Sequence, residues 1–377
     1  MKIAVIGTRG IPATFGGIER HCEELYSHIV KMGHDVTIYA RKGYIDSNVR
    51  LFRGIKIVPL WAPQSKHLET IFHTFWALLH IIFSDADIIH FHAQGPCLFA
   101  WLPKLLSPAK KLVFTCHGLD WQRNKWSLIA KNIIQIGEIF SARFFDERIM
   151  VSNSLEEHYK KQYGVNSEVI ANGTTVENPL PPDFIKNEFG LNNKDYLLFI
   201  GRLVPEKAPH KLIEAFKKID THKKLVITGG SSATGDYVNY LKRLASGDTR
   251  IIFTSYLYEN ALKEIYSNAY LYVSTSELEG MPLTLLEAMS YGIPTVVSPI
   301  PVHIEVVNKY EKFGYVFPSG KIYDIKTKLQ SILDSSEDEK QQKGISGKQR
   351  IKECYNWQFA AEKLDKLYRK IGNLYIQ

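Results

Sequence analysis

The chain has 377 residues, more than one ordinary domain holds, so two domains are the first expectation. Hydrophobic residues make up 45% of it, aromatic residues 12% and charged residues 23%, which excludes collagen, long disorder and a membrane-spanning bundle. The four cysteines lack metal-binding or redox spacing, which excludes a disulfide scaffold and predicts buried thiols in a reducing, cytoplasmic compartment. These cysteines are Cys22, Cys97, Cys116 and Cys354.

The net charge of +8 is spread evenly along the chain. Residues 1–180 hold 20 Lys and Arg against 16 Asp and Glu, and residues 181–377 hold 27 against 23, so each half carries +4. A nucleic-acid-binding protein more often has a concentrated basic stripe or a known motif. Neither is present, so we expect no nucleic-acid partner. The charge instead favours phosphates, nucleotides or anionic lipid as partners.

Strands and helices alternate through the first half of the chain. A buried strand over 2–6 ends in Gly7, and a helix over 17–32 and a strand over 35–40 follow, which together form a βαβ unit. Further strands are predicted at 55–59, 87–92 and 111–116, with helical stretches between them. This alternation predicts a doubly wound α/β domain with a parallel sheet.

An almost continuous apolar run covers residues 68–83. Its sixteen residues fall short of the 18 or more expected of a spanning helix, and His73 and His80 interrupt it. One interpretation is a helix buried between the sheet and its neighbours. The alternative is a helix that docks on a bilayer or an acceptor lipid, which predicts peripheral contact with the inner face of the membrane.

Two features suggest metal binding, and both have simpler interpretations. Asp85 and Asp87 form an Asp-x-Asp pattern, but they stand between a helical stretch and a strand, which favours a turn. His90 and His92 lie on one face of the next strand, but the sequence offers no obvious third ligand. We therefore expect no metal.

A proline-rich connection at 178–182 separates the two halves, and the α/β alternation then restarts. Strands are predicted at 196–201, 224–229, 250–254, 271–274 and 294–298, and helices at 209–219, 237–245, 261–268 and 283–291. An amphipathic helix occupies 357–371. We expect one domain over 1–178, completed by the carboxyl-terminal helix in 357–377, and a second over 179–356.

The strongest chemical signal is the segment that follows the strand at 271–274. Glu279 lies in the loop at the carboxyl end of this strand, where α/β sheets bind ligands, and Glu287 lies about one turn into the next helix. Pro282 suits the first helical turn, and the free backbone N–H groups around 281–283 form an anion site. Taken alone, either carboxylate is better explained as an acid favoured at a helix N-terminus.

Two other loops offer groups that bind phosphate. Arg202 and Lys207 follow the strand at 196–201, and a guanidinium fork with an ammonium suits a diphosphate. Gly16 and Gly17 lie in the first strand-to-helix loop, where the lack of side chains lets the backbone approach a phosphate closely. This loop does not match the dinucleotide fingerprint, and the chain has no P-loop.

The set Gly201-Arg202…Lys207 with Glu279-x7-Glu287 resembles the donor site of family 4 retaining glycosyltransferases. The resemblance spans nearly the whole chain. It implies the GT-B fold, in which two Rossmann-like domains face a cleft and a carboxyl-terminal helix crosses back to the first domain. Residues 6–17 and 117–126 are similar to a bacterial branch that contains rhamnosyltransferases.

The resemblance also implies roles for single residues. Arg202 and Lys207 would bind the donor's diphosphate and stabilise the charge of the departing nucleotide. Glu279 would hydrogen-bond sugar hydroxyls and Glu287 the ribose hydroxyls. The implied donor site comprises Gly16, Gly17, Arg202, Lys207, Glu279, Gly280, Met281, Pro282, Leu283 and Glu287.

His117 lies after a strand, where the family contacts the sugar or the leaving group, so it joins Arg202, Lys207 and Glu279 as an implied catalytic residue. A histidine that merely ends a strand is the alternative interpretation. The acceptor would meet Asp120, Trp121, Arg123 and Trp126, although the two tryptophans are equally plausible as core residues.

The predicted function is a retaining glycosyltransferase that needs neither metal nor cofactor. It would move a sugar, with rhamnose favoured, from a dTDP- or UDP-linked donor to a glycan or lipid-linked saccharide in bacterial surface polysaccharide synthesis. Three alternatives stay open: a nucleotide-sugar epimerase, a phosphorylase of the same fold, and a non-catalytic relative that binds nucleotide sugar.

Overall fold

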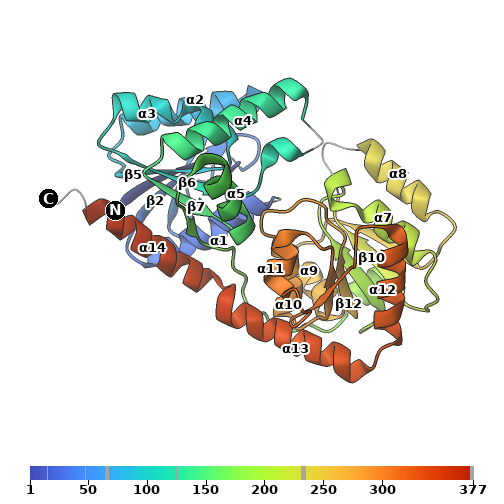
Figure 1. Ribbon diagram of the computed structural model, residues 1–377. Coiled ribbons are helices and arrows are strands. Elements are labelled where there is room, and N and C mark those ends of the chain that lie inside the picture. The colour runs from blue at the N-terminus through green and yellow to red at the C-terminus, as the bar shows by residue number, and fades with distance from the viewer. Residues whose placement is uncertain (15, 47, 64–67, 124–125, 231–234, 374–377) are drawn as a thin grey trace. The chain divides into compact units, whose positions relative to one another are not determined.

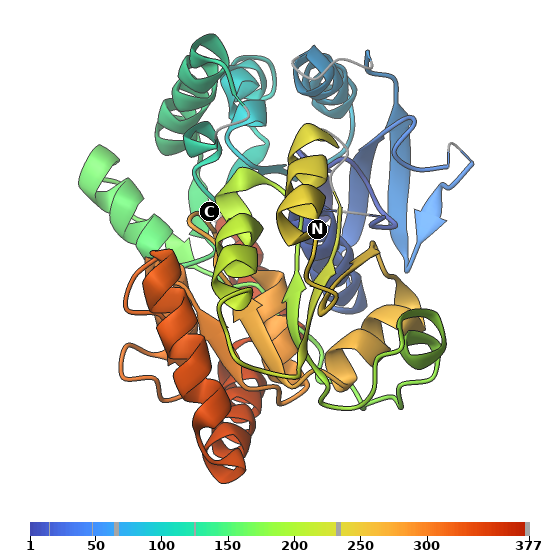
Figure 2. The same cartoon turned by 90° about the vertical axis from the view of Figure 1, so that its right-hand side faces the viewer.

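The computed structural model describes residues 1–14, 16–46, 48–63, 68–123, 126–230 and 235–373. The chain divides into two compact units, Met1–Gly173 with Trp357–Gln377, and Thr174–Asn356. The boundary lies a few residues before the predicted one at 178. Each unit has a parallel sheet with helices on both faces (Figures 1 and 2), which confirms the predicted α/β fold class.

The first unit contains an eight-stranded sheet in the order β3-β4-β2-β1-β5-β6-β7-β8. All neighbours pair in parallel except β3 and β4. The central strands consist largely of consecutive apolar residues, because helices cover both faces of the sheet. The strands are β1 Lys2–Ile6, β2 Asp35–Arg41, β3 Leu51–Phe52, β4 Ile55–Leu60, β5 Ile88–His92, β6 Lys111–Cys116, β7 Glu147–Met150 and β8 Glu168–Val169.

The strand order of the first unit reverses between β1 and β5, which places helices on opposite faces of the sheet. Helix α14 packs against α1 on one face, while α2, α3 and α4 cover the other (Figure 1). The carboxyl-terminal helix thus belongs to the first unit, as the resemblance implied. The helices are α1 Gly17–Lys31, α2 Leu68–Ile82, α3 Trp101–Leu106, α4 Leu128–Arg143, α5 Asn153–Tyr163 and α14 Trp357–Asn373.

The second unit contains a six-stranded parallel sheet in the order β11-β10-β9-β12-β13-β14. Its order reverses between β9 and β12, so the loops after these two strands flank the crevice where open α/β sheets bind ligands. The strands are β9 Tyr196–Ile200, β10 Lys224–Thr228, β11 Ile251–Ser255, β12 Leu271–Ser274, β13 Thr295–Val297 and β14 Tyr315–Val316.

Helices α7, α8 and α12 form an apolar core with one face of this sheet, and α10 packs against α13. Sequence periodicity does not predict α13, because most of its side chains are polar and glycines supply two of its four buried positions. The helices are α6 Phe184–Phe189, α7 Pro209–Phe216, α8 Gly235–Ala245, α9 Glu259–Ser267, α10 Leu283–Ser290, α11 Pro301–Val307, α12 Ile322–Asp334 and α13 Glu337–Cys354.

Two expectations need correction. Cys354 is exposed at the end of α13, whereas the other three cysteines are buried as predicted. The apolar run at 68–83 forms α2, but only one side of this helix is buried, with Phe72 and Trp76 more than 40% exposed on the other. Among the described residues, no helix has the length and hydropathy needed to cross a membrane.

Candidate functional site

Lys207 and Glu279 meet because β9 and β12 are neighbours in the second sheet. Lys207 lies in a short 3₁₀ turn, Pro205–Lys207, just after β9, and Glu279 lies in the loop after β12. The carboxyl ends of parallel strands meet at the same edge of a sheet. The strand order therefore brings together two residues that are far apart in sequence.

The two loops that carry these residues are tied to each other by hydrogen bonds. The Thr275 hydroxyl donates to the carbonyl oxygens of Lys207 and Ala208 at 3.2 and 3.0 Å. The Glu277 N–H donates to the Glu206 carbonyl oxygen at 2.8 Å. Because three hydrogen bonds join the loops, the cation and the carboxylate are held on one framework.

Lys207 and Glu279 form an ion pair with little exposure to solvent. The Lys207 ammonium donates to the Glu279 carboxylate, and the side chains are 17% and 10% exposed. Burial would raise the pKa of Glu279, but the charge of Lys207 and hydrogen bonds to the carboxylate outweigh it and hold this pKa below its usual value. Glu279 is therefore ionised at neutral pH and can accept hydrogen bonds.

His303 lies beside this ion pair, and sequence reasoning did not find it. It is fully buried in α11, its Nδ1 lies 3.0 Å from the Ser298 hydroxyl, and its Nε2 has no hydrogen-bond partner among the described residues. Burial lowers its pKa to about 4, although the charge of Glu279 opposes this effect. The sequence signal that could have found it is its place just after a strand end, like that of Glu279.

Helix α10 follows the Glu279 loop and begins at Leu283, the residue predicted from the sequence. Pro282 caps the helix in an extended conformation rather than standing in its first turn, and its carbonyl oxygen accepts from the N–H groups of Leu285 and Leu286. Glu287, one turn into α10, accepts a hydrogen bond from the Tyr266 hydroxyl at 2.8 Å. Gly280 and Met281 are buried before the cap.

Arg202 lies two residues after the end of β9, which has β10 as one of its neighbours. The next residue, Leu203, donates its N–H to the Gly230 carbonyl oxygen at 3.0 Å, and the charge of Arg202 lowers the pKa of Tyr256, although burial raises that pKa overall. A hollow of about 290 Å³ adjoins this turn, and Leu203, Gly230 and Tyr256 are among its lining residues. Arg202 therefore immediately precedes a residue that lines this hollow.

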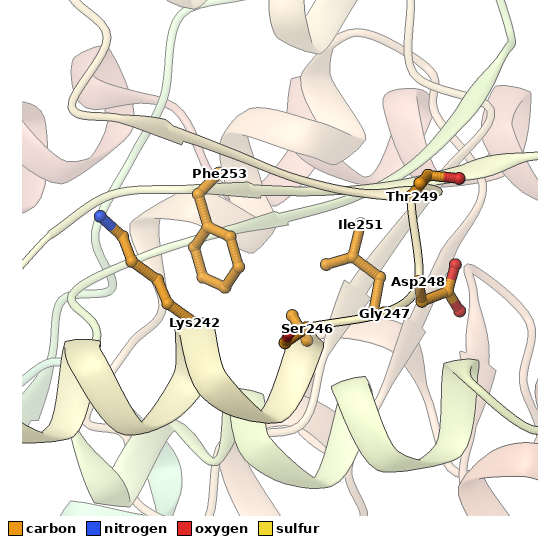
Figure 3. Close-up of a pocket in the computed structure, with 8 residues that line it drawn as sticks. Lys242, Ser246, Gly247, Asp248, Thr249, Ile251 and Phe253 are labelled. Carbon is orange, nitrogen blue, oxygen red and sulfur yellow. The ribbon is translucent and has the colours of Figure 1, made fainter.

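A second hollow, of about 250 Å³, lies between α8 and β11 (Figure 3). Lys242 and Phe253 lie at one end, and Asp248 and Thr249 at the other. None of the predicted site residues lines it. This hollow is therefore not the site that the sequence indicates.

The glycine loop of the first unit is held against α1 by carboxylates. Gly16 caps α1 with a φ of 109°, and a Cβ there would come within 1.9 Å of the Glu19 carboxylate. Glu19 accepts from the Arg9 N–H at 3.0 Å, and Glu23 accepts from the Ala13 N–H at 2.6 Å. Any side chain at position 16 would therefore be strained, as expected for a loop that needs glycine.

The Asp-x-Asp segment anchors the amino terminus. Asp87 accepts from the Lys2 N–H at 2.7 Å, and Asp85 forms an ion pair with the Lys2 ammonium. These contacts agree with the interpretation of a helix-to-strand turn.

His117 follows β6 and meets two buried histidines, His21 and His92, which the sequence analysis did not connect with it. The His117 Nε2 lies 2.8 Å from the His92 Nδ1, a hydrogen-bond distance. The ring-nitrogen ligand atoms of the three residues lie within 4.8 Å of one another. Two imidazoles on one tetrahedral zinc place their nitrogens roughly 3.3 Å apart, given Zn–N bonds of about 2.0 Å. The observed His92–His117 distance thus fits a hydrogen bond better than shared metal ligation.

The predicted acceptor residues pair with other side chains of the first unit. The Arg123 guanidinium lies 3.0 Å from the Asp120 carboxylate, so these charges compensate each other. The Trp121 indole N–H donates to the buried Glu138 carboxylate at 2.7 Å. Trp126 is half-buried. Trp121 is therefore fixed in place by the interior of its own unit.

Two family models match the chain, one in each half. Residues 15–178 match the model of Glycosyltransferase Family 4, and residues 182–350 match that of Glycosyl transferases group 1. A relative from Escherichia coli, the UDP-Gal:alpha-D-GlcNAc-diphosphoundecaprenol alpha-1,3-galactosyltransferase, is 28% identical over 79% of this chain and 80% of its own.

Solved structures share the fold over the whole chain. The sucrose-phosphate synthase from Thermosynechococcus elongatus superposes with a TM-score of 0.85, 20% identity and 99% coverage of both chains. Anabaena HepE in complex with UDP-glucose gives a TM-score of 0.80 at 14% identity, over 98% of this chain and 99% of its own. With a family model matched in each half and this fold, the chain belongs to the GT-B glycosyltransferases of the family 4 type.

Proposed function

We propose that the protein is a retaining glycosyltransferase that uses a nucleoside-diphosphate sugar to extend a glycan or lipid-linked saccharide in bacterial surface polysaccharide synthesis. The observation that carries this proposal is the Lys207–Glu279 pair at the β9–β12 switch point. A diphosphate needs cations and a sugar needs hydrogen-bond acceptors, and this edge of the sheet offers both.

Donor binding separates the roles of the two charges. The diphosphate binds the Lys207 ammonium in place of Glu279, and Arg202 acts as a second cation. The Glu279 carboxylate can then accept hydrogen bonds from sugar hydroxyls. Glu287 accepts from the ribose hydroxyls in the same way. The donor also contacts the residues at the N-terminus of α10, which are Gly280, Met281, Pro282 and Leu283. In the first unit, the loop that faces the donor contains Gly16 and Gly17.

The reaction proceeds on one face of the sugar. The bond from the anomeric carbon to the phosphate oxygen breaks, and the acceptor hydroxyl oxygen bonds to the same carbon from the same face. The hydroxyl proton passes to the departing phosphate, whose charge Lys207 and Arg202 stabilise. No metal or cofactor takes part in this scheme. His117 contacts the sugar or the leaving group, and Asp120, Trp121, Arg123 and Trp126 face the acceptor.

The proposed donor is a dTDP- or UDP-linked sugar, with rhamnose favoured. The similarity of residues 6–17 and 117–126 to a branch with rhamnosyltransferases supports rhamnose, and thus a thymidine carrier. The named donor of the Escherichia coli relative and the ligand of HepE support a uridine carrier. The undecaprenol-linked substrate in the name of the same relative supports a lipid-linked acceptor.

A panel of nucleotide sugars tests the proposal. We expect one donor to raise the melting temperature selectively, because a ligand that binds only the folded state stabilises it. That donor and a lipid-linked acceptor should then yield a glycoside with the donor's anomeric configuration, read by NMR. An inverted product would refute the retaining reaction, and absence of any stabilising donor would refute the site.

We also propose that the protein works in the cytoplasm at the inner face of the membrane, in peripheral contact with it. Helices α2, α3 and α4 cover one face of the first sheet (Figure 1). All three carry solvent-exposed apolar side chains, and this surface is named the apolar helical face. Its six most exposed apolar residues are Leu68, Phe83, Leu105, Leu106, Leu128 and Ile129. Exposed apolar area of this kind is typical of a surface that docks on lipid.

Charge on the same helices favours an anionic bilayer as the occupant. Lys131 and Arg143 lie on α4, and Lys104 of α3 pairs with Asp146 at 2.8 Å, while Glu138, the acidic residue of these two helices, is buried. On α2, Glu69 is paired with Arg41 at 2.8 Å. The apolar helical face thus combines apolar side chains with a cationic balance, which suits anionic lipid headgroups.

A further inference from the structure

A chain of buried polar rings leads from His117 into the core of the first unit. The His92 Nδ1 lies 2.8 Å from the His117 Nε2, and the His92 Nε2 lies 2.7 Å from the Tyr26 hydroxyl. The Tyr26 hydroxyl in turn lies 2.9 Å from the His90 Nδ1. The linked groups therefore run from β6 through β5 to α1.

This hydrogen-bonded series of side chains ends at two further hydroxyl groups. The His90 Nδ1 lies 2.5 Å from the Tyr368 hydroxyl of α14, and its Nε2 lies 2.7 Å from the Thr115 hydroxyl. His90, His92, Tyr26 and Tyr368 are all fully buried, whereas His117 is partly exposed. Of this hydrogen-bonded series of side chains, only His117 thus reaches the surface of its unit.

Burial keeps the imidazoles of this chain neutral. Desolvation, joined by the neighbouring imidazoles, holds the pKa of His90, His92 and His117 well below the usual range. A neutral imidazole carries one N–H and one bare nitrogen, so each ring donates at one nitrogen and accepts at the other. Donors and acceptors then alternate along the chain, and the tautomer of one ring fixes that of the next.

The place of these rings in the fold argues against simple core filling. They cluster around β5, beside the switch point of the first sheet, where ligand sites of α/β folds lie. A Cβ at Gly7, the residue after β1, would come within 2.0 Å of the His92 carbonyl oxygen, so the backbone packs tightly there. Apolar side chains would fill the same volume without the desolvation cost of buried polar groups.

We propose that His92 and Tyr26 are positioning residues that hold the His117 ring by its Nε2 and leave its Nδ1 to face the ligand in one fixed tautomer. Among the described residues, the hydrogen bond found for the His117 ring uses its Nε2 and not its Nδ1. Whichever direction the hydrogen bonds take, one proton occupies each link, so His117 presents a defined donor or acceptor. The catalytic part of this inference depends on the proposed role of His117 in sugar transfer.

Tyr26→Phe tests the proposal because it removes one hydroxyl of the chain at a distance from the ligand. The matched control is Tyr39→Phe, since the Tyr39 hydroxyl makes an equivalent 2.9 Å contact with the His80 Nδ1 outside the chain. Long-range ¹H–¹⁵N spectra of histidine-labelled, full-length protein report the tautomer of each ring. His117→Asn assigns the His117 signals.

We expect a single neutral tautomer of His117 in the wild type and in Tyr39→Phe, and a mixture of tautomers in Tyr26→Phe. An unchanged His117 tautomer in Tyr26→Phe would overturn the proposal. A histidine signal shifted by metal in the purified protein, with stoichiometric zinc found by elemental analysis, would overturn it too, because the rings would then be ligands.

Turnover gives a second readout. With dTDP-rhamnose or UDP-glucose as donor, Tyr26→Phe should lower kcat about tenfold, as for partners that orient a functional histidine, and leave the KM for the donor within twofold. His92→Asn keeps an amide near the Nδ1 position and should retain more activity than His92→Ala. Unchanged kcat in Tyr26→Phe would refute the catalytic part. If neither these two donors nor any other donor of the panel binds, the proposed function fails while the NMR result still decides the positioning.

Discussion

Glu138 of α4 is a buried carboxylate surrounded by polar side chains. Its carboxylate is 1% exposed and accepts from the Trp121 indole, the Tyr163 hydroxyl and the Gln94 amide, at 2.7, 2.8 and 3.3 Å. The His158 Nε2 lies 2.8 Å from the same carboxylate. A buried carboxylate is tolerated when its lone pairs are satisfied in this way.

Glu138→Gln should therefore destabilise the protein by about 2–4 kcal/mol, since the amide NH2 would face donors and leave one of them unpaired. Urea unfolding at neutral pH measures this loss. Glu157→Gln is the control, because Glu157 lies exposed on the next helix. A loss below about 0.5 kcal/mol in Glu138→Gln would contradict the role given to this carboxylate.

Single residues also show where sequence reasoning ends. The sequence points to Lys207 and Glu279 because each follows a strand in a recognisable pattern, and the structure brings them into contact. It does not reveal that His303 lies beside Glu279 or that His117 contacts His92, because these contacts depend on which strands are neighbours. Spacing along the chain does not encode the strand order.

At the scale of elements, hydrophobicity predicts that α2 is a helix but not which of its sides is buried. The apolar run predicts the helix, but its periodicity is too weak to reveal that Phe72 and Trp76 lie on the exposed side. The exposed apolar residues of α3 and α4 join them only because the three helices cover one face of the same sheet (Figure 1). The apolar helical face is thus a tertiary feature.

Vesicle binding tests the apolar helical face. Vesicles that contain phosphatidylglycerol should co-sediment the wild type at low salt, and a triple change of Leu105, Leu128 and Ile129 to Gln should weaken binding at least about tenfold, because three apolar side chains no longer enter the bilayer. Ile345→Gln, an exposed change in α13, should bind like the wild type. Equal binding by the triple variant would refute the assignment, as would a wild type that binds no vesicles.

At the scale of the whole molecule, buried neutral histidines make stability depend on pH. Burial lowers the pKa of His21 and His73 to about 4, and holds those of His90, His92 and His117 well below the usual range. Their pKa in the unfolded chain is about 6.5. The unfolded state therefore binds more protons below this pH, and the free energy of unfolding falls as the pH falls.

We expect the protein to be less stable at pH 5 than at pH 7.5 in urea unfolding. A histidine whose folded pKa is about 4 contributes roughly 2 kcal/mol to this loss. His73→Gln removes one such group and should reduce the difference between the two pH values by a comparable amount. The same free energy of unfolding at both pH values would contradict the burial of neutral imidazoles.

The fold of both units follows from the α/β alternation, and the family pattern adds the helix α14 that returns to the first unit. The polar helix α13 and the two-residue strands β8 and β14 could not be predicted, since they are held by packing rather than by periodicity. Lys207 and Glu279 could be singled out from the sequence because both lie in loops that follow strands, and the chemistry of such loops is local. The histidine chain was not, because it is assembled across three elements.

The central claim is that the second unit binds a nucleoside diphosphate at Lys207 and Glu279. Calorimetric titration of UDP and dTDP into the wild type, Lys207→Ala and Lys211→Ala tests it most directly. Lys211 is the matched control, because it pairs with Glu277 of the same loop at 2.5 Å but is more exposed. We predict that Lys207→Ala weakens binding of the preferred nucleotide by about 10- to 100-fold, the loss of one charge-assisted contact, and that Lys211→Ala binds like the wild type. Equal affinity of the wild type and Lys207→Ala would contradict the account.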